Sequence, residues 1–450
     1  MPRPIAAVVD AVLPQRLGVP FRWLWSAATL TNIGDGIALA AGPLLIASQT
    51  RDPFIVSLAF FCEFLPSLVL GSFVGVIVDR VDRRRILVLV NLARAGVLVV
   101  LATTIATGMV SIVTILVALL LIATAETFAD LAATSLLPQY VARDDLGLAN
   151  ARLQSAYLLT NQLLGPPIGA FLFVVGMAIP FAVNAVSFAF AAVIVARIAR
   201  SGMPAHDDPA RAGGPGDGRS EATGDETGDE TGDGTGGVAS IWRDLAEGFR
   251  WLRHHAPMRT LALTVIAFNV TFGAATSVLV LYAGDRLGMD SVGFGLLTTA
   301  SAIGGIAGTV AYSALERRFG LANLMRGGLL IETATHLIFA LTTSPAVALA
   351  TMVVFGAHEV VWWTTSITIR QRSVPAELMG RVGGIYTVGL TGGIVVGTPI
   401  GGLLAKGFGI TAPFWFGFVG SALLVIVLWR EFRHIAHDPR TEPSPAASTT

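Results

Sequence analysis

Long apolar runs separated by short polar turns dominate this chain. A bilayer core of about 30 Å is crossed by a helix of about 20 mainly apolar residues, and runs of that length recur six times before residue 200 and six times after residue 256. The pattern therefore predicts an all-α membrane protein with twelve transmembrane helices. We expect them near residues 22–48, 54–78, 86–107, 110–134, 149–175, 180–198, 257–283, 291–315, 321–343, 346–370, 380–406 and 411–431.

The composition excludes an ordinary soluble domain. Of the 450 residues, 53% are hydrophobic and only 13% are charged, and the mean hydropathy is +0.69, whereas soluble proteins carry about 25% charged residues. The first twenty residues lack the long apolar core of a signal peptide, because Asp10 and Pro14 interrupt them. We therefore expect them to form a cytoplasmic tail.

One polar stretch divides the chain into two halves. Residues 201–237 consist largely of Gly, Asp, Glu and Thr repeats with nothing apolar to bury, which predicts a disordered cytoplasmic linker. The expected organisation is an N-terminal six-helix half (1–200), this linker with an interfacial helix (201–256), a C-terminal six-helix half (257–432) and a disordered cytoplasmic tail (433–450).

The interfacial helix is predicted from the periodicity of Ser240 to His255. Leu245, Phe249 and Leu252 recur at helical spacing opposite a charged face. We expect the helix to lie along the inner membrane surface, with a partner-binding helix as the alternative.

The charged residues fix an orientation rather than a charged partner. Thirty basic and thirty acidic residues balance, which argues against a nucleic-acid partner. Basic residues in short loops are held on the cytoplasmic side, and placing both termini there leaves only Arg51, Arg286 and Lys406 outside. Cys62 is the only cysteine, so there is no intramolecular disulfide and no cysteine-based zinc site.

The two halves repeat each other, as parallel halves of a transporter would. GPPIGA, beginning at Gly165, aligns with GTPIGG, beginning at Gly397, and the loop before the first aligns with the loop before the second. Further pairs in register are Asn32 with Asn269, Gly36 with Gly273, Asp79 with Glu316 and Arg80 with Arg317. Two pseudo-symmetric six-helix bundles follow from these pairs.

The turn GVIVDRVDRRR resembles the signature between the second and third helices of the major facilitator superfamily, G-x-x-x-D-R-x-G-R-[KR]. Its matching residues are Gly75, Asp79, Arg80, Arg83 and Arg84. Asp82 stands where the signature has its second glycine. The resemblance implies the major facilitator fold in the cell membrane.

A second resemblance points to export. Gly165, Pro166 and Gly169 look like the core of the antiporter signature of export members, and Gly397, Pro399 and Gly401 repeat it in the other half. The segments IWRDLAEGFRWLRHH and TSLLPQYVARDDLGLANA are similar to those of drug exporters and of the enterobactin exporter, sometimes grouped as transmembrane secretion effectors.

The charged turn is a candidate inner gate. Gly75 allows close helix approach, Asp79 is expected to face the positive N-terminal end of the eleventh helix near Gly380, and Arg80 to Arg84 are expected to bind carboxylates across the seam between the halves. Glu316 and Arg317 repeat this pair in the second half. The alternative is that the arginines merely fix the topology, which we prefer for Arg85.

Asp35 is the first candidate for proton coupling. It lies near the middle of the first predicted helix between Gly34 and Gly36, and an ionisable group at membrane depth is a functional candidate by default. A carboxyl group there can exchange a proton as the site opens to either side. A hydrogen bond between helices from a permanently protonated acid is the alternative.

Further ionisable residues lie within predicted helices. Glu126 and Glu359 are second candidates for coupling, Glu332 and His336 are one turn apart and can share a proton, and Arg94 and Asp130 are expected to form a structural ion pair. Glu63 is expected nearer one membrane surface.

The segment HEVVW begins like the zinc-binding H-E-x-x-H helix, but Trp362 stands at the second histidine position, so we exclude a metalloprotease. His358 and Trp362 share a helical face instead, and we count both among the candidates for proton coupling or the substrate cavity. Trp362 and Trp363 can either stack on a flat or cationic ligand or anchor the packing of the bundle.

Together these observations predict a secondary transporter rather than an enzyme, monomeric in lipid and working by alternating access. Because the sequence contains no nucleotide-binding P-loop, we expect no cofactor and a proton gradient as the energy source. Resemblance implies antiport and efflux, as in bacterial multidrug resistance, and we expect a hydrophobic or amphiphilic small-molecule substrate such as a drug or siderophore-like metabolite. Uptake or facilitated transport of a metabolite, and a non-transporting sensor or scaffold, are the alternatives.

Overall fold

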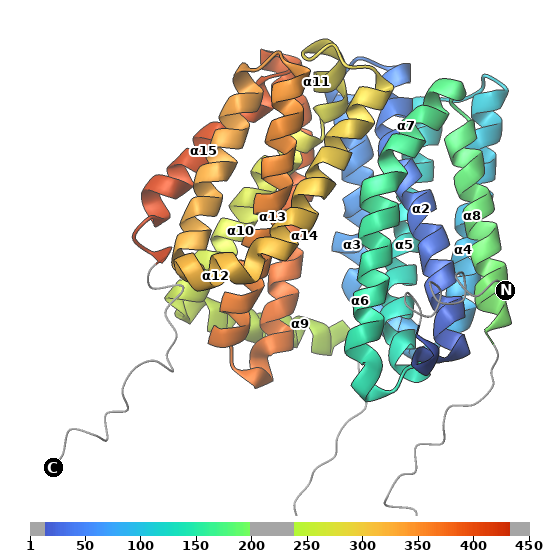
Figure 1. Cartoon of the computed structure of the whole chain (residues 1–450), viewed down its shortest axis with the longest axis horizontal. Coiled ribbons are helices and arrows are strands. Elements are labelled where there is room, and N and C mark those ends of the chain that lie inside the picture. The colour runs from blue at the N-terminus through green and yellow to red at the C-terminus, as the bar shows by residue number, and fades with distance from the viewer. Residues whose placement is uncertain (1–13, 199–237, 433–450) are drawn as a thin grey trace, which may run out of the picture.

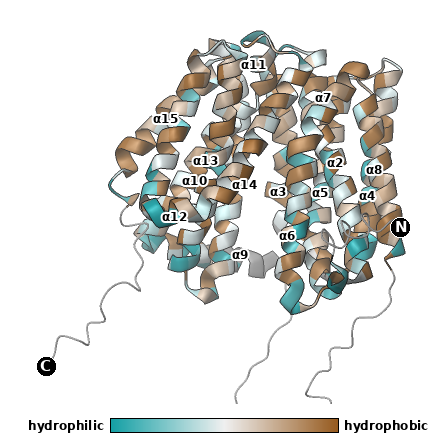
Figure 2. Cartoon of the chain, in the orientation of Figure 1, coloured by the Kyte–Doolittle hydropathy of each residue, from teal (hydrophilic) through white to brown (hydrophobic). Residues whose placement is uncertain are grey.

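The computed structural model describes residues 14–198 and 238–432, and the predicted linker (201–237) and most of both predicted tails lie outside them. The described residues are helical nearly throughout and contain no strand. Two helical bundles stand side by side (Figure 1). Apolar residues occupy the middle of most helices and polar residues gather at their ends (Figure 2), as expected for helices that cross a membrane.

The N-terminal bundle contains the segments before the linker. They are η1 (Gln15–Leu17), α2 (Gly18–Gln49), α3 (Pro53–Arg80), α4 (Arg83–Ala106), α5 (Ile112–Tyr140), η2 (Arg143–Asp145), α6 (Leu146–Tyr157), the π-helical η3 (Leu158–Leu164), α7 (Gly165–Val175) and α8 (Ile179–Arg197).

The C-terminal bundle contains the segments after the predicted linker. Its segments are α9 (Val238–His254), α10 (Ala256–Thr276), α11 (Leu279–Asp285), α12 (Ser291–Leu341), α13 (Pro345–Ser373), η5 (Ala376–Leu378), α14 (Met379–Phe408) and α15 (Ala412–Leu428).

Ten helical stretches in the described chain are long and apolar enough to cross a membrane, compared with the twelve spans predicted. Two features account for the difference. The helix α12 joins two predicted spans across Gly320, whose φ of 72° departs from helical geometry, and α15 has only 17 residues. With α12 taken as two helices and α15 included, each bundle contains the six helices that the repeat predicts.

Helix ends follow local capping rules. The Asp52 carboxylate accepts from Phe54 N at 3.0 Å at the start of α3, and Asp290 accepts from Gly293 N at 2.7 Å at the start of α12. Asp82 caps α4 through Arg84 N at 3.0 Å. Its φ of −57° does not require a glycine, which explains why the turn tolerates aspartate at the signature's glycine position.

One predicted span is interrupted. Residues 257–283 form α10 and α11 rather than a single helix. At the break the Ser277 hydroxyl donates to Ala274 O at 3.1 Å and to Thr398 O of α14 at 3.2 Å. A serine hydroxyl that bonds to backbone carbonyls competes with regular helical bonding.

The glycines of the antiporter-like signature are contact points between helices. A Cβ atom on Gly169 would lie under 3 Å from the Ile37 backbone of α2, and a Cβ atom on Gly397 would do the same against Val270 of α10. Gly165 and Gly401 are equally close to Gly36 and Ala274. The repeat therefore places matching close approaches, α2 against α7 and α10 against α14, in the two bundles.

The two bundles meet through α3 against α14 and through α7 against α12. At the face that carries α11 and the α2–α3 turn, ion pairs cross between the halves: Arg51 to Asp285 at 3.1 Å and Asp52 to Lys406 at 2.6 Å. The ribbons of the two bundles diverge toward the other end, which carries α9 and the α3–α4 turn (Figure 1). We refer to these ends as the α11 face and the arginine-rich face.

The predicted amphipathic helix is present as α9 and lies across the arginine-rich face (Figure 1). Glu247 pairs with Arg381 of α14 at 2.8 Å, and Gly248 lies against Arg381 and Ile385. The expected apolar side is divided, because Leu252 is buried in the C-terminal bundle whereas Phe249 is 61% exposed.

Substituting alanine for Gly169 should destabilise the bundle. The new Cβ atom would overlap backbone atoms of α2, and such overpacking costs about 1–3 kcal/mol. We expect a lower melting temperature for Gly169→Ala in detergent. Gly96→Ala is the matched control, because a Cβ atom there meets nothing within 4 Å, and equal melting temperatures for the two variants would contradict the packing argument.

Removing Lys406 should loosen the closure at the α11 face. Its hydrogen bond holds the pKa of Asp52 below the ordinary aspartate value, so the contribution is complete above that ordinary value and is lost as pH falls through the lowered pKa. For Lys406→Met we expect the ratio of closed to open molecules to fall by at most about fivefold, as for an exposed ion pair.

Electron spin resonance distances between labels at the exposed positions Met109 and Phe408 would measure this ratio. Arg286→Met is the control, because the Arg286 guanidinium donates to Leu341 O and Thr342 O within its own half. If neither Lys406→Met nor a fall in pH changes the distance distribution, the ion pair between Asp52 and Lys406 does not hold the α11 face closed.

Candidate functional site

Asp35 is placed by close packing of α2. Gly34 and Gly36 flank it, and a Cβ atom on Gly36 would lie under 3 Å from Asn161 and Gly165. On the other side, a Cβ atom on Gly34 would overlap the Asn184 side chain of α8. The glycines bring α2 against its neighbours and direct the carboxylate toward α4.

Arg94 of α4 is the partner of Asp35. Their side chains are 2.6 Å apart, and the Arg94 side chain is only 3% exposed. Glu126 of α5 is 3.7 Å from the same guanidinium, and the ring of Phe188 lies 3.9 Å from it. The predicted pairing of Arg94 with Asp130 is therefore wrong. It was based on the similar depth of the two residues in the membrane, but the guanidinium points to Asp35 and Glu126.

Other acids surround this single cation. Asp130 is within electrostatic reach of Arg94 and Glu126, and Glu63 of α3 is within reach of Asp35 and Glu126. The charged side chains described here give the N-terminal site more carboxylates than cations. We refer to Asp35, Glu63, Arg94, Glu126 and Asp130 as the acidic cluster.

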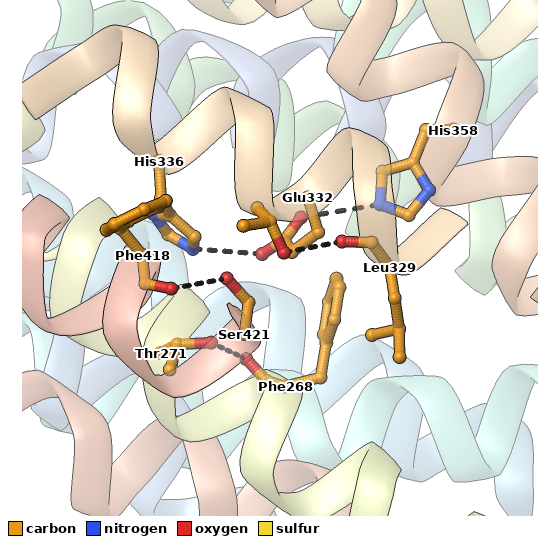
Figure 3. Close-up of polar contacts among 9 residues, drawn as sticks. Phe268, Thr271, Leu329, Glu332, His336, His358, Phe418 and Ser421 are labelled. Atoms are coloured by element: carbon orange, nitrogen blue, oxygen red, sulfur yellow. Dashed lines mark hydrogen bonds and ion pairs between the residues drawn. The ribbon is translucent and has the colours of Figure 1, made fainter. Parts of the chain in front are cut away.

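The corresponding site in the C-terminal bundle has another arrangement. Glu332 lies between two imidazoles, with His336 Nε2 at 3.0 Å from Oε1 and His358 Nε2 at 3.3 Å from Oε2 (Figure 3). The expected contact between Glu332 and His336 is present. His358 joins them from α13, which the sequence spacing did not indicate.

A cavity of about 250 Å³ lies between the bundles. Its walls include Leu39, Pro43, Phe60 and Gln162 of the N-terminal half and Phe272, Phe355, Phe414, Glu332, His336 and Glu359 of the C-terminal half. Among the described residues that line it, none is lysine or arginine. The cavity thus combines aromatic surface with two carboxylates.

The two tryptophans differ in their surroundings. Trp362 is buried and its ring stacks on Phe268 at 5.0 Å, so it packs within the bundle. Trp363 is 44% exposed. Neither lines the cavity.

The gate residues are distributed within their own halves in this conformation. Arg84 donates to Val195 O at 3.0 Å and to Ala196 O at the end of α8, and Glu316 pairs with Arg372 at 3.1 Å. Arg80 and Arg317 are exposed, and Arg83 makes contacts at the same end of the bundle.

For two residues of the predicted gate, Gly75 and Asp79, the structure describes no gate contact. A Cβ atom on Gly75 would meet nothing within 4 Å, and the side chain of Asp79 lies outside the described part of the chain. The expected contacts of these residues across the seam stay a prediction.

Sequence reasoning missed three features. It gave no role to Asp52, although an aspartate before Pro53 signals a helix cap. It did not identify the cavity-lining phenylalanines, which look like ordinary core residues in sequence. Nothing in the local pattern indicated the π-helix η3, which carries Gln162 of the cavity wall.

Within residues 14–198 and 238–432, no group of three or more His, Cys, Asp or Glu side chains is arranged so that it could hold a metal ion. The residues that converge are carboxylates, imidazoles and one guanidinium, whose common chemistry is the exchange of protons and the binding of charge.

Comparisons with known proteins agree with this architecture. A family model described as Major Facilitator Superfamily matches residues 24–390 and 261–449. A chloramphenicol resistance protein of Streptomyces lividans is 31% identical over 35% of this chain and 40% of its own. Multidrug resistance protein 1 of Bacillus subtilis is 28% identical over 42% of this chain and 48% of its own length. Each alignment therefore spans less than half of the relative.

A solved structure extends the comparison to the whole fold. A bacterial homologue of the iron transporter ferroportin in its inward-facing state has a TM-score of 0.69 at 17% identity, covering 92% of this chain and 98% of that one. A bacterial ferroportin homologue in its outward-facing state has a TM-score of 0.57 at 16% identity, covering 93% of this chain and 100% of that one.

Removing Arg94 should destabilise the protein through the acids that it neutralises. Arg94→Met leaves Asp35 and Glu126 without a cation at membrane depth, and breaking a buried pair costs about 3–5 kcal/mol. We expect the double variant Asp35→Asn/Arg94→Met to recover part of this loss in denaturant unfolding. If the two changes are additive, the pair contributes no coupling.

Proposed function

The chain belongs to the Major Facilitator Superfamily, and on that premise we propose that it is a proton-coupled exporter of hydrophobic or amphiphilic small molecules. A member of this family is a membrane transporter rather than an enzyme. The observation that carries the proposal is the Asp35–Arg94 pair at 2.6 Å. It lies one turn along α2 from Leu39, which lines the cavity.

The conformation supports alternating access. Cross-half ion pairs close the α11 face, and the fold is more similar to the inward-facing than to the outward-facing state of the ferroportin homologue. The positive-inside rule assigns the arginine-rich face to the cytoplasm. The protein then lies in the cell membrane with both termini cytoplasmic and with the cavity reached from the inside.

Protonation of the acidic cluster is the proposed coupling step. A proton on Asp35 removes the charge that holds Arg94, so α2 and α4 are released from their ion pair. The carboxylate then regains Arg94 when the proton leaves. Protons that move down the gradient in this way supply about 2.3 kcal/mol per 100 mV per charge in the electrical part.

The walls of the cavity support the substrate class. Phe60, Phe272, Phe355 and Phe414 offer flat apolar surface, which favours aromatic or amphiphilic molecules over strongly hydrated ones. Two of the relatives bear names of drug resistance, and we extend that role to this chain. The proposed unit is a monomer that needs no cofactor.

Transport in reconstituted vesicles tests the proposal. With an acidic lumen and an alkaline exterior, a proton antiporter accumulates ethidium or chloramphenicol inside whichever way it is inserted. We expect this accumulation to stop when nigericin collapses the pH gradient. Asp35→Asn should lower it by about 10²-fold or more, since loss of an essential proton-transfer group has effects of that size.

Asp144→Asn is the control, because that carboxylate is exposed and lies on η2, away from the cavity. Flux that persists after the gradient collapses would identify a facilitative transporter instead. No flux of either probe through folded protein would favour a sensor or scaffold.

A further inference from the structure

Glu332, His336 and His358 form a three-residue hydrogen-bonded group in the wall of the cavity. Each carboxylate oxygen of Glu332 meets the Nε2 atom of a different ring, at 3.0 Å and 3.3 Å (Figure 3). The side chains are 1%, 6% and 1% exposed in the order Glu332, His336, His358. An ionised carboxylate accepts two hydrogen bonds here, so both Nε2 atoms carry a hydrogen.

Tight packing fixes both rings. A Cβ atom on Gly417 of α15 would overlap the ring of His336, and one on Gly328 would approach His358 and Trp362. The rings of Phe268 and Phe355 meet His358 edge-on, at 6.2 Å and 6.1 Å between centroids. The imidazoles therefore keep their orientation toward Glu332 whatever their protonation state.

The two histidines are not equivalent. His336 lines the cavity together with Glu332, whereas His358 does not. The Nδ1 atom of His358 is buried and has no hydrogen-bond partner in the described chain. A second proton on His358 would leave a buried N–H unsatisfied, so an added proton belongs on His336.

We propose that Glu332, His336 and His358 form a proton-binding site in the C-terminal half, distinct from the acidic cluster, in which His336 takes one proton from the cavity. The group carries one negative charge when both rings are neutral and none when His336 is protonated. Its protonation then decides whether the cavity favours a cationic or a neutral molecule. That last consequence rests on the proposed function.

The charged and polar residues around the group bear on this assignment. Among the described residues, Glu359 of α13 is within electrostatic reach of Glu332 and His358. Thr271 of α10 and Ser421 of α15 lie beside the group and do not titrate in the physiological range (Figure 3). Both histidines donate to Glu332, and of the two only His336 lines the cavity, so the proton arrives at His336.

Solid-state ¹⁵N NMR of the full protein in lipid bilayers, with its seven histidines labelled, tests the site without any transport measurement. His336→Gln and His358→Gln assign the signals. We expect His336 to change from singly to doubly protonated within about pH 5 to 9 and His358 to keep its hydrogen on Nε2 throughout.

In Glu332→Gln a smaller share of His336 should be doubly protonated at any given pH, because the imidazolium loses a contacting opposite charge. Glu359→Gln is the matched control and should have a smaller effect, since no hydrogen bond joins Glu359 to either ring among those described. A His336 that stays neutral over the whole range, or a transition indifferent to Glu332, would overturn the proposal.

Binding of tetraphenylphosphonium tests the link to selectivity. In Asp35→Asn protein, where residue 35 cannot ionise, affinity should fall by up to about tenfold per pH unit on acidification, as for competition with one proton. Adding Glu332→Gln should remove this dependence. If it remains, the group does not control the charge preference, whereas failure of efflux alone would contradict only the proposed function.

Discussion

A charge carried into lipid must meet an opposite charge, a proton or water, and this constraint shapes both halves of the molecule. In the N-terminal half Arg94 satisfies Asp35 at 2.6 Å and Glu126 at 3.7 Å. In the C-terminal half the register of the repeat brings Glu332 to within one residue of the place of Arg94, and two imidazoles satisfy it. Neighbouring positions of the repeat thus carry a cation in one bundle and a carboxylate in the other.

The rest of the architecture keeps these groups in place while allowing the bundles to move as units. Glycines bring helices into backbone contact inside each bundle, as Gly169 and Gly397 show, so the helices of a bundle are closely packed. Between the bundles the contacts are fewer and are concentrated at α3 with α14 and α7 with α12. A cavity at that boundary changes shape when the bundles rotate, whereas the ion pairs within each bundle travel with it.

The sequence predicted most of what depends on local pattern. Apolar runs marked the helices, and the one-turn spacing of Glu332 and His336 predicted that they interact. The repeated glycines indicated the symmetry of the halves, and the structure added their role as helix contacts. It paired Arg94 with the wrong acid, because depth along a helix says nothing of the direction in which a side chain points. His358 was a candidate from the sequence, but its contact with Glu332 and the cavity phenylalanines were identified only by the structure, since helix packing brings them together from distant segments.

The ion pairs at the α11 face have a consequence for the medium in which the protein works. In both pairs, Arg51 with Asp285 and Asp52 with Lys406, the basic side chain is more than half exposed, so dissolved ions reach them. At about 0.15 M salt the screening length is about 8 Å, and it shortens as salt rises. In the proposed alternating-access cycle, the balance between the two orientations of the bundles is therefore tied to ionic strength, and high salt shifts it toward separation of the α11 face.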